Sequence, residues 1–299
     1  MRKLWFWGII AVQIIFWTWS ATAAQAAPLP VVAAESTYGV IAEAIGGPHV
    51  KVASIINNPN VDPHTFEADP AVAREVAQAK VAVMNGIGYD DWMQKMISAN
   101  PAAGRQVVVA ADLDPHLVMA DKNPHIFYDP RVALLTAARL AQVFSQDDPA
   151  HAPQFEQNFK KFSQSLLQIY NTAQMVIAQH PALTVTATEP VVGYMIRLLG
   201  YESINQKFQF NVMNDTEPAP QDVVNYENSL RQHQVAVLFY NQQVISPLTK
   251  RMQDIAKTAG VPIVGVDEFV PPHTGYVQWQ VETLEALNKA LNTAGKVAH

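Results

Sequence analysis

Four side chains of the types that bind metals recur along the chain in similar local sequences. His64 lies in "NNPNVDPHTFEADP", His125 in "NPHIFYDP", Glu189 in "TATEPVVGYM" and Glu268 in "GVDEFVPP". Each follows an apolar run, and both histidines precede an Asp-Pro pair, which is typical of the start of a helix. Two imidazoles and two carboxylates form a donor set that suits zinc, manganese or ferrous iron. If the four side chains meet, they predict a site for one divalent cation.

Each of these residues also has a simpler interpretation. A lone histidine in a loop is more often a hydrogen-bonded surface residue than a ligand. Glu189 alone fits a helix N-cap before Pro190, where the helix dipole favours a carboxylate. Glu268 and the adjacent Asp267 fit solvated charges at the end of a strand, and the choice between them as the last ligand stays open. The repeated context, a strand end followed by the side chain and a helix start, favours the metal site.

The other histidines are weaker candidates. His116 is near His125 in the sequence, and His273, in "PPHTGY", is expected near the mouth of a cleft. The remainder occupy turns, helix ends or the tail, and we interpret them as solvated; they are His49, His151, His180, His233 and His299.

Short runs rich in Val and Ile alternate with amphipathic stretches, which predicts parallel βα units. Strands are predicted at 29–36, 50–56, 80–86, 105–111, 183–189, 234–241 and 261–268. Helices are predicted at 37–47, 69–79, 190–199, 220–232, 247–259 and 276–293. Ligands of parallel α/β sheets bind beyond the carboxyl ends of the strands. The four side chains follow strands, so they are expected at the facing edges of two sheets.

The middle of the chain is different, because the stretch from Pro153 to about Ala178 contains no helix breaker. Its apolar residues recur every three or four positions; they are Phe155, Phe159, Phe162, Leu166 and Ile169. This spacing predicts one long amphipathic helix, nearly 40 Å long at about 1.5 Å per residue. The predicted fold class is α/β, with two parallel-sheet lobes bridged by one long rigid helix. The predicted segments are a signal peptide at 1–26, an N-terminal lobe at 27–150, the linking helix at 151–180 and a C-terminal lobe at 181–299.

The first residues have the three parts of a secretory signal. Met1-Arg2-Lys3 is basic, "LWFWGIIAVQIIFWTWS" is apolar, and Ala24-Gln25-Ala26 is a small-residue cleavage site. No later stretch has the length and apolarity of a membrane span. The sequence contains no cysteine, which excludes disulfides, thiolate metal sites, cysteine nucleophiles and a lipidated cysteine. We therefore expect a periplasmic protein without a lipid anchor.

The charge balance and the motifs exclude other classes of function. Asp and Glu outnumber Lys and Arg, 26 to 20, and the formal net charge of −6 argues against nucleic-acid binding. The sequence contains no HExxH, no GxSxG and no phosphate-binding loop of the GxxxxGK[ST] type. A secreted metal-dependent hydrolase is therefore the weaker alternative, and an adhesin-like surface protein is another. We expect a binding protein rather than an enzyme.

Several segments resemble, in order, those of the metal-binding solute receptors of ABC importers, the zinc/manganese/iron family called cluster A-I or cluster 9. They include "VVAAESTYGVIAEAIGG", "NPNVDPHTFEADP", "NPHIFYDP", "TEPVVGYMIRLLGYE" and "VPIVGVDE". The resemblance implies two lobes bridged by a long helix, with one divalent metal held between them as cargo. It also implies delivery of that metal to a membrane permease; we expect a monomer.

The resemblance assigns roles to particular residues. His64 and His125 match the two histidine ligands of the N-terminal lobe, and Glu189 matches a third ligand that is histidine in typical zinc members. Glu268 or Asp267 matches the last carboxylate, and alignment on the preceding strand favours Glu268. The long histidine-rich loop of many zinc members is replaced by the short "HLVMADKNPH". Two carboxylates favour manganese or ferrous iron, whereas zinc generally binds such a set more tightly than manganese, so the metal stays open.

Overall fold

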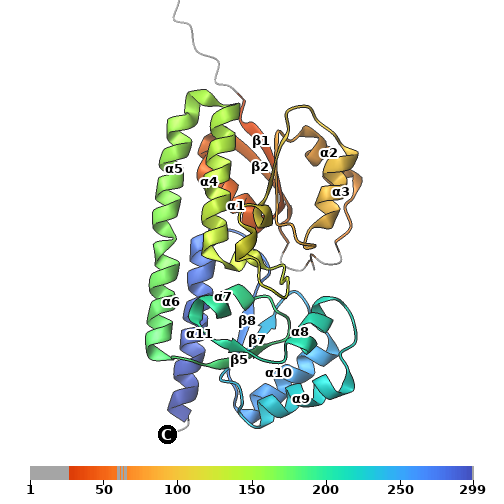
Figure 1. Cartoon of the computed structure of the whole chain (residues 1–299), viewed down its shortest axis with the longest axis vertical. Coiled ribbons are helices and arrows are strands. Elements are labelled where there is room, and N and C mark those ends of the chain that lie inside the picture. The colour runs from red at the N-terminus through yellow and green to blue at the C-terminus, as the bar shows by residue number, and fades with distance from the viewer. Residues whose placement is uncertain (1–26, 59–60, 62, 64–65, 298–299) are drawn as a thin grey trace, which may run out of the picture.

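Two four-stranded parallel sheets organise the molecule, one in each of two lobes (Figure 1). The structure is a computed structural model that describes residues 27–58, 61, 63 and 66–297. The predicted signal peptide, residues 1–26, lies outside the described residues. The predicted α/β fold class with two parallel sheets is confirmed.

The sheet of the N-terminal lobe has the strand order β2-β1-β3-β4. Its strands are β1 (Leu29–Glu35), β2 (Val50–Ile56), β3 (Val81–Met84) and β4 (Gln106–Val109). Along β1, Val31 and Ala33 belong to the large core beneath α1 (Ser36–Gly46) and α4 (Pro130–Asp147). Val32 and Ala34 belong to a separate core beneath α2 (Pro70–Gln78) and α3 (Asp91–Ala99). The strand is apolar on both faces because helices cover both sides of the sheet.

The sheet of the C-terminal lobe has the strand order β6-β5-β7-β8. Its strands are β5 (Thr184–Ala187), β6 (Glu202–Ser203), β7 (Leu238–Asn241) and β8 (Ile263–Val266). Its helices are α7 (Gly193–Leu199), α8 (Gln206–Met213), α9 (Pro220–Arg231), α10 (Pro247–Ala259) and α11 (Tyr276–Val297). A capping box between Ser246 and Thr249 fixes the start of α10.

The connection between the lobes is a nearly continuous helical rod. Its two parts, α5 (Ala152–Ser165) and α6 (Leu167–Gln179), follow one another along one side of both lobes (Figure 1). Leu166 separates them but keeps helical dihedral angles, φ −59° and ψ −24°. The single predicted helix is thus interrupted at one residue, where the N–H of Ile169 bonds to the carbonyl of Leu166 in a tighter turn.

The predicted strands are all present, but five of them are three or four residues shorter than the apolar runs that predicted them. Apolar residues beyond a strand are also buried: Ala110 and Ala111, after β4, lie in the 3₁₀ helix η3 (Ala110–Asp112). Three elements had no clear pattern in the sequence, namely α3, β6 and α8. β6 has two residues, too few to show an alternation.

One core is continuous across both lobes. It includes Phe127 and Tyr128 from the N-terminal lobe and Tyr276 and Trp279 from α11, all buried. The rings of Tyr128 and Trp279 lie with their centroids 4.7 Å apart. The lobes are therefore packed against one another, in addition to being linked by α5 and α6. Within the part of the chain that the structure describes, no helix is both long and apolar enough to cross a bilayer.

Candidate metal centre

Three polar side chains of the C-terminal lobe lie at the carboxyl ends of neighbouring strands. Glu189 comes two residues after β5, Asn241 is the last residue of β7, and Glu268 comes two residues after β8. These strands lie side by side in the order β5-β7-β8. Each of the three residues is at most 1% exposed. Parallel strands bring their carboxyl ends to one edge of the sheet, so this edge gathers two buried carboxylates.

His125 reaches the same place from the N-terminal lobe. It is the N-cap residue of the 3₁₀ helix η5 (Ile126–Tyr128), it is fully buried, and its Nε2 lies 3.5 Å from Oε2 of Glu268. Its Nδ1 lies 2.8 Å from Oδ1 of Asn123. An amide oxygen only accepts, so a neutral imidazole here carries its proton on Nδ1. The lone pair is then on Nε2, the nitrogen that faces the carboxylate, as metal ligation requires.

Two further side chains hold Glu268. Nδ2 of Asn241 donates to Oε1 of Glu268, and it lies 3.2 Å from Oε2 of Glu189. The hydroxyl of Tyr89, from the N-terminal lobe, donates to Oε2 of Glu268 at 3.1 Å. Burial and the charge of Glu268 raise the pKa of Tyr89 well above its usual value, so this hydroxyl keeps its proton. Both oxygens of Glu268 are therefore oriented by hydrogen bonds from the two lobes.

Asp267 has different hydrogen-bond partners from Glu268. Its Oδ1 accepts hydrogen bonds from the side-chain amides of Gln242 and Gln243, at 3.1 and 3.2 Å. Its backbone carbonyl accepts from the hydroxyl of Tyr128 at 2.7 Å, which joins the two lobes. The structure thus brings the carboxylate of Glu268, and not that of Asp267, to His125.

The helix after Glu189 does not start where the sequence suggested. α7 begins at Gly193 with Val192 as its N-cap, so the prediction that Glu189 caps a helix starting at Pro190 was wrong. The carbonyl of Pro190 accepts hydrogen bonds from Nδ2 of Asn123 at 2.6 Å and from the N–H of Gly193, which forms a turn before the helix. A Cβ at Gly193 would lie 2.5 Å from Asn123 Nδ2, so glycine permits this approach between the lobes.

The remaining sequence candidates have other outcomes. His64 lies outside the described residues. His116, in the 3₁₀ helix η4 (Pro115–Leu117), and His273 are both exposed. Neither His116 nor His273 takes part in the hydrogen bonds and the ion pair given above for the cluster.

Sequence reasoning missed Glu35, the last residue of β1. It is 1% exposed, and neither of its carboxylate oxygens has a hydrogen-bond partner among the described residues. Burial, together with the charges of Asp90 and Glu268, raises the pKa of Glu35 well above its usual range. Burial also raises the pKa of Asp90 to about 6, against the hydrogen bonds that its carboxylate accepts from the backbone of Gly86 and Asn85. The signal was present, because "VVAAES" places Glu35 at a strand end just as Glu189 and Glu268 are placed.

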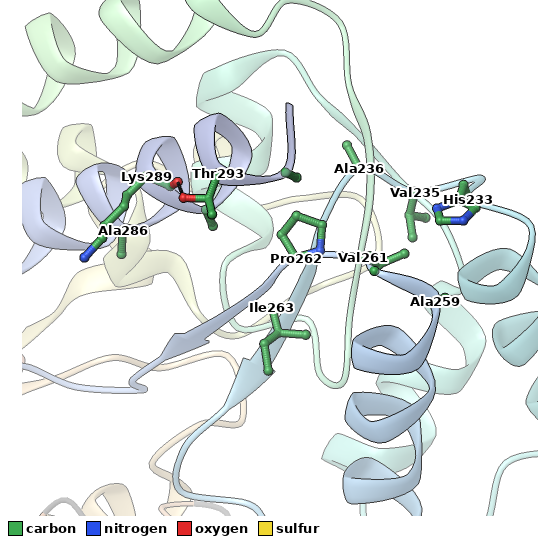
Figure 2. A pocket seen from close by; sticks show the side chains of 13 residues that line it. His233, Val235, Ala236, Ala259, Val261, Pro262, Ile263, Ala286, Lys289 and Thr293 are labelled. Atoms are coloured by element: carbon green, nitrogen blue, oxygen red, sulfur yellow. Dashed lines mark hydrogen bonds between the residues drawn. The ribbon is translucent and has the colours of Figure 1, made fainter. Parts of the chain in front are cut away.

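A cavity lies elsewhere in the C-terminal lobe. Its volume is about 980 Å³, and its walls include Ala236, Val261 and Pro262 together with Lys289 and Thr293 of α11 (Figure 2). Ala236 precedes β7 and Val261 precedes β8, so the cavity adjoins the amino ends of the strands, opposite the buried carboxylates. Its lining is mostly apolar. The chemistry of a cation site therefore belongs to the carboxyl-end cluster and not to this cavity.

Comparison with known proteins places these features in a family. A family model described as the periplasmic component A of a zinc-uptake complex (ZnuA) matches residues 31–290. The metal ABC transporter substrate-binding lipoprotein SloC of Streptococcus mutans is 23% identical over 248 residues, 79% of this chain and 79% of that protein. The manganese-binding lipoprotein MntA of Bacillus subtilis is 24% identical over 244 residues, covering 78% and 77% of the two chains. The iron-binding protein YfeA of Yersinia pestis is 22% identical over 236 residues, covering 76% and 72%.

Solved structures show the same fold. A Mn-bound periplasmic metal-binding protein of Candidatus Liberibacter asiaticus superposes with a TM-score of 0.72 at 19% identity, covering 87% of this chain and 98% of that one. A crystal structure of ZnuA gives a TM-score of 0.72 at 22% identity, covering 90% and 99% of the two chains.

Proposed function

This chain belongs to the family of periplasmic zinc-uptake complex A components, and from that membership we propose that it captures one divalent transition metal between its lobes and delivers it to the membrane permease of an ABC importer. The observation that carries the proposal is the convergence of His125, Glu189 and Glu268 in one buried cluster. The imidazole of one lobe thereby lies beside the carboxylate of Glu268 from the other lobe, and the amide of Asn241 links that carboxylate to Glu189.

The proposed ligands are His64, His125, Glu189 and Glu268. His64 enters on the sequence alone, whereas the other three rest on their geometry as well. Asp267 has a different proposed role, because its hydrogen bonds to two glutamine side chains and to Tyr128 fix the turn that presents Glu268. Asn241, Asn123 and Tyr89 orient the ligands without contacting the metal.

Electrostatics favours a cation at this place. Charged carboxylates are expensive to bury unless a partner of opposite charge compensates them. Glu189 and Glu268 are almost completely buried, and one amide group, on Asn241, is shared between them. A divalent ion between the two carboxylates would compensate their negative charge. Nitrogen and oxygen donors in this combination suit Mn²⁺, Fe²⁺ and Zn²⁺, with Zn²⁺ generally bound more tightly than Mn²⁺.

We propose that the chain acts as a receptor and not as an enzyme. Four protein ligands would fill a tetrahedral site, whereas catalytic zinc sites keep one position open for water. We further propose that it works as a monomer that binds no nucleic acid and stays in the periplasm without a lipid anchor. The acidic net charge supports the absence of nucleic-acid binding, and the absence of cysteine from the sequence supports the absence of a lipid anchor. The relatives SloC and MntA are named as lipoproteins, so fractionation of cells into periplasm and membrane tests the last of them directly.

The metal content of purified protein tests the ligand set. Wild-type protein is expected to hold one tight equivalent of Mn²⁺ or Zn²⁺, measured by competition with a chelator at low free metal. Glu268→Ala removes a ligand and is expected to weaken binding by at least about ten-fold, because even changes to groups behind the ligands have effects of that size. Glu285→Ala is the matched control, since it removes an exposed carboxylate of α11 that is not part of the cluster. Equal losses in the two variants, or tight binding by Glu268→Ala, would overturn the proposed ligand set.

A further inference from the structure

Three side chains of metal-binding type meet on the N-terminal lobe, outside the centre described above. His49 ends the 3₁₀ helix η1 (Gly47–His49), Asp148 follows α4, and His151 ends the 3₁₀ helix η6 (Pro149–His151). One ligand atom from each residue lies within 4.8 Å of those of the other two. About a hundred residues of chain separate His49 from the other two, so the fold and not local sequence brings them together.

The cluster is far from the proposed cargo site along the molecule. α1 starts directly after the carboxyl end of β1, which faces the other lobe, and η1 follows its far end. α4 likewise starts just after η5 and His125, and it ends at Asp147 beside the cluster. With 11 residues, α1 alone spans about 16 Å at 1.5 Å per residue. The three residues therefore lie beyond the ends of α1 and α4 that are remote from the other lobe.

The side chains of the cluster are already held in place. Nδ1 of His151 lies 2.6 Å from Oδ2 of Asp148. The imidazoles of His49 and His151 are stacked, with ring centroids 3.7 Å apart and planes 20° from parallel. The ring of His49 also packs edge-on against the buried ring of Phe155, at 5.9 Å. All three ligand-type residues are half-buried, so their polar atoms remain within reach of solvent.

From this geometry we propose that His49, Asp148 and His151 form a second divalent-metal site, suited to Zn²⁺. Donor atoms around a tetrahedral zinc at about 2.1 Å are roughly 3.4 Å apart. A metal lies in the plane of each imidazole that binds it, so the stacked rings of His49 and His151 must turn apart before both can hold the same ion. The metal takes the place of the hydrogen bond between His151 and Asp148, and water completes the coordination. Binding is weaker than in the cargo site, because these three ligands are half-exposed whereas His125, Glu189 and Glu268 are enclosed.

A bound ion would fasten two corners of the lobe to each other. One corner is the turn from α1 through η1 into β2, and the other is the turn from α4 through η6 into α5. The two corners now meet through the stacked rings of His49 and His151 and the edge contact of His49 with Phe155, and Nδ2 of Asn158 in α5 donates to the carbonyl of Ile45 in α1. Metal at this position is therefore expected to stabilise the N-terminal lobe whether or not the cargo site is filled.

Zinc binding by the full chain tests the proposal. Equilibrium dialysis of wild-type protein against Zn²⁺ is expected to give two equivalents, one tight and one weaker. His49→Gln and His151→Gln keep the size of the side chain and should each weaken only the second equivalent, by at least about ten-fold. His233→Gln, at an exposed histidine of the other lobe, is the matched control and should retain both equivalents.

A second readout separates this site from the cargo site. In Glu268→Ala, Zn²⁺ should still raise the melting temperature, and the added change His151→Gln should abolish that rise. A wild-type protein that binds one equivalent only, or cluster variants that bind zinc as wild type does, would overturn the second site. If Glu268→Ala loses the tight equivalent and keeps the weaker one, both proposed sites are supported. If Glu268→Ala keeps the tight equivalent, the proposed cargo ligands are refuted and the proposal of a second site still stands.

Discussion

A single amide group, that of Asn241, serves both carboxylates of the candidate centre. Its Nδ2 contacts Glu268 and Glu189, while its backbone N–H donates to Oγ1 of Thr188 and its Oδ1 accepts from the N–H of Gln243. These bonds fix the side chain, so the amide dipole points its positive end at the two acids. At the scale of the residue, Asn241 moderates the repulsion between two negative groups whenever no cation is bound.

Replacing Asn241 by aspartate should therefore make folding more dependent on metal. Asn241→Asp replaces the hydrogen-bond donor Nδ2 with a third buried negative charge, which destabilises the metal-free protein. A bound divalent ion would offset that repulsion between the three carboxylates. The gap between the melting temperatures measured with chelator and with excess metal is expected to widen relative to wild type. Asn225→Asp adds the same charge at an exposed position of α9 and should leave the gap unchanged. An unaltered gap in Asn241→Asp would contradict the role given to this amide.

The choice between Asp267 and Glu268 shows how far residues can be read from sequence. Side chains of a strand alternate between faces, and in β8 it is Val264 and Val266 that are buried. Glu268 continues this alternation beyond the end of the strand, whereas Asp267 falls on the other face. The alternation of buried residues along β8 was visible in the sequence, but it is guaranteed only where a strand is hydrogen-bonded to its neighbour, and Glu268 lies beyond the end of β8. The orientation of Asp267 toward two glutamines depends on packing that the sequence does not display.

At the scale of elements, Asp129 joins the start of α4 to α7 of the other lobe. It caps α4 by accepting from the N–H of Arg131, and its Oδ2 lies 2.7 Å from Nη2 of Arg197. Arg197 also donates to the carbonyl of Leu117. Burial alone would raise the pKa of Asp129, but hydrogen bonds from Arg131 and Arg197 outweigh it and lower the pKa below its usual value.

This ion pair should be visible as a pH-dependent stability. A carboxyl whose pKa is lowered by folding stabilises the protein above its unfolded pKa, near 3.8, and loses that contribution as pH falls through the lowered value. Asp129→Asn keeps a capping side chain but removes the charge. It is expected to reduce the free energy of unfolding by about 1–2 kcal/mol at pH 7, since the arginines are partly exposed.

Urea denaturation at pH 7 and pH 3 checks this expectation, and the deficit of Asp129→Asn should shrink at the lower pH. Asp69→Asn is the matched control, because Asp69 begins α2 with the same Asp-Pro sequence, is exposed, and accepts from the N–H groups of Ala71 and Val72 in its own helix. A deficit of equal size in the control would show that capping, and not the contact between lobes, is responsible.

The elements themselves could be predicted to the extent that they bury a continuous apolar face. The Asp-Pro starts of α2 and α4 and the stripe of the rod were apparent because each has a local physical cause. The turn before α7 was not, since it depends on Asn123, some seventy residues away, reaching the carbonyl of Pro190. Contacts between distant segments leave no local pattern.

At the scale of the whole molecule, hydrogen bonds between the lobes accompany the shared core. Oγ of Ser36 donates to the carbonyl of Val270 at 2.7 Å, and the N–H of Val270 donates to Oγ1 of Thr37 at 3.1 Å. The hydroxyl of Tyr276 donates to the carbonyl of Phe127 at 2.8 Å. With the rod along one side, these contacts leave little freedom for a hinge.

Metal binding should therefore move the lobes only slightly. Spin labels at Gln94→Cys on α3 and Asn225→Cys on α9 attach without ambiguity, because the chain has no other cysteine. The distance between them is expected to change by about 1 Å or less when metal is added, as in preorganised complexes. In the variant Ser36→Ala with Thr37→Val the change should be larger. A large closure in the otherwise unmodified protein would contradict the restraint attributed to these contacts.

The enclosure of His125, Glu189 and Glu268 also has a kinetic meaning. Ions usually escape from proteins by stepwise hydration, in which incoming solvent substitutes for each departing nitrogen or oxygen. Here solvent scarcely reaches those atoms, so spontaneous leakage should be slow. If these residues hold the ion, its release is expected to require a partner that separates the two lobes, so the packing that slows leakage would also favour release at the permease.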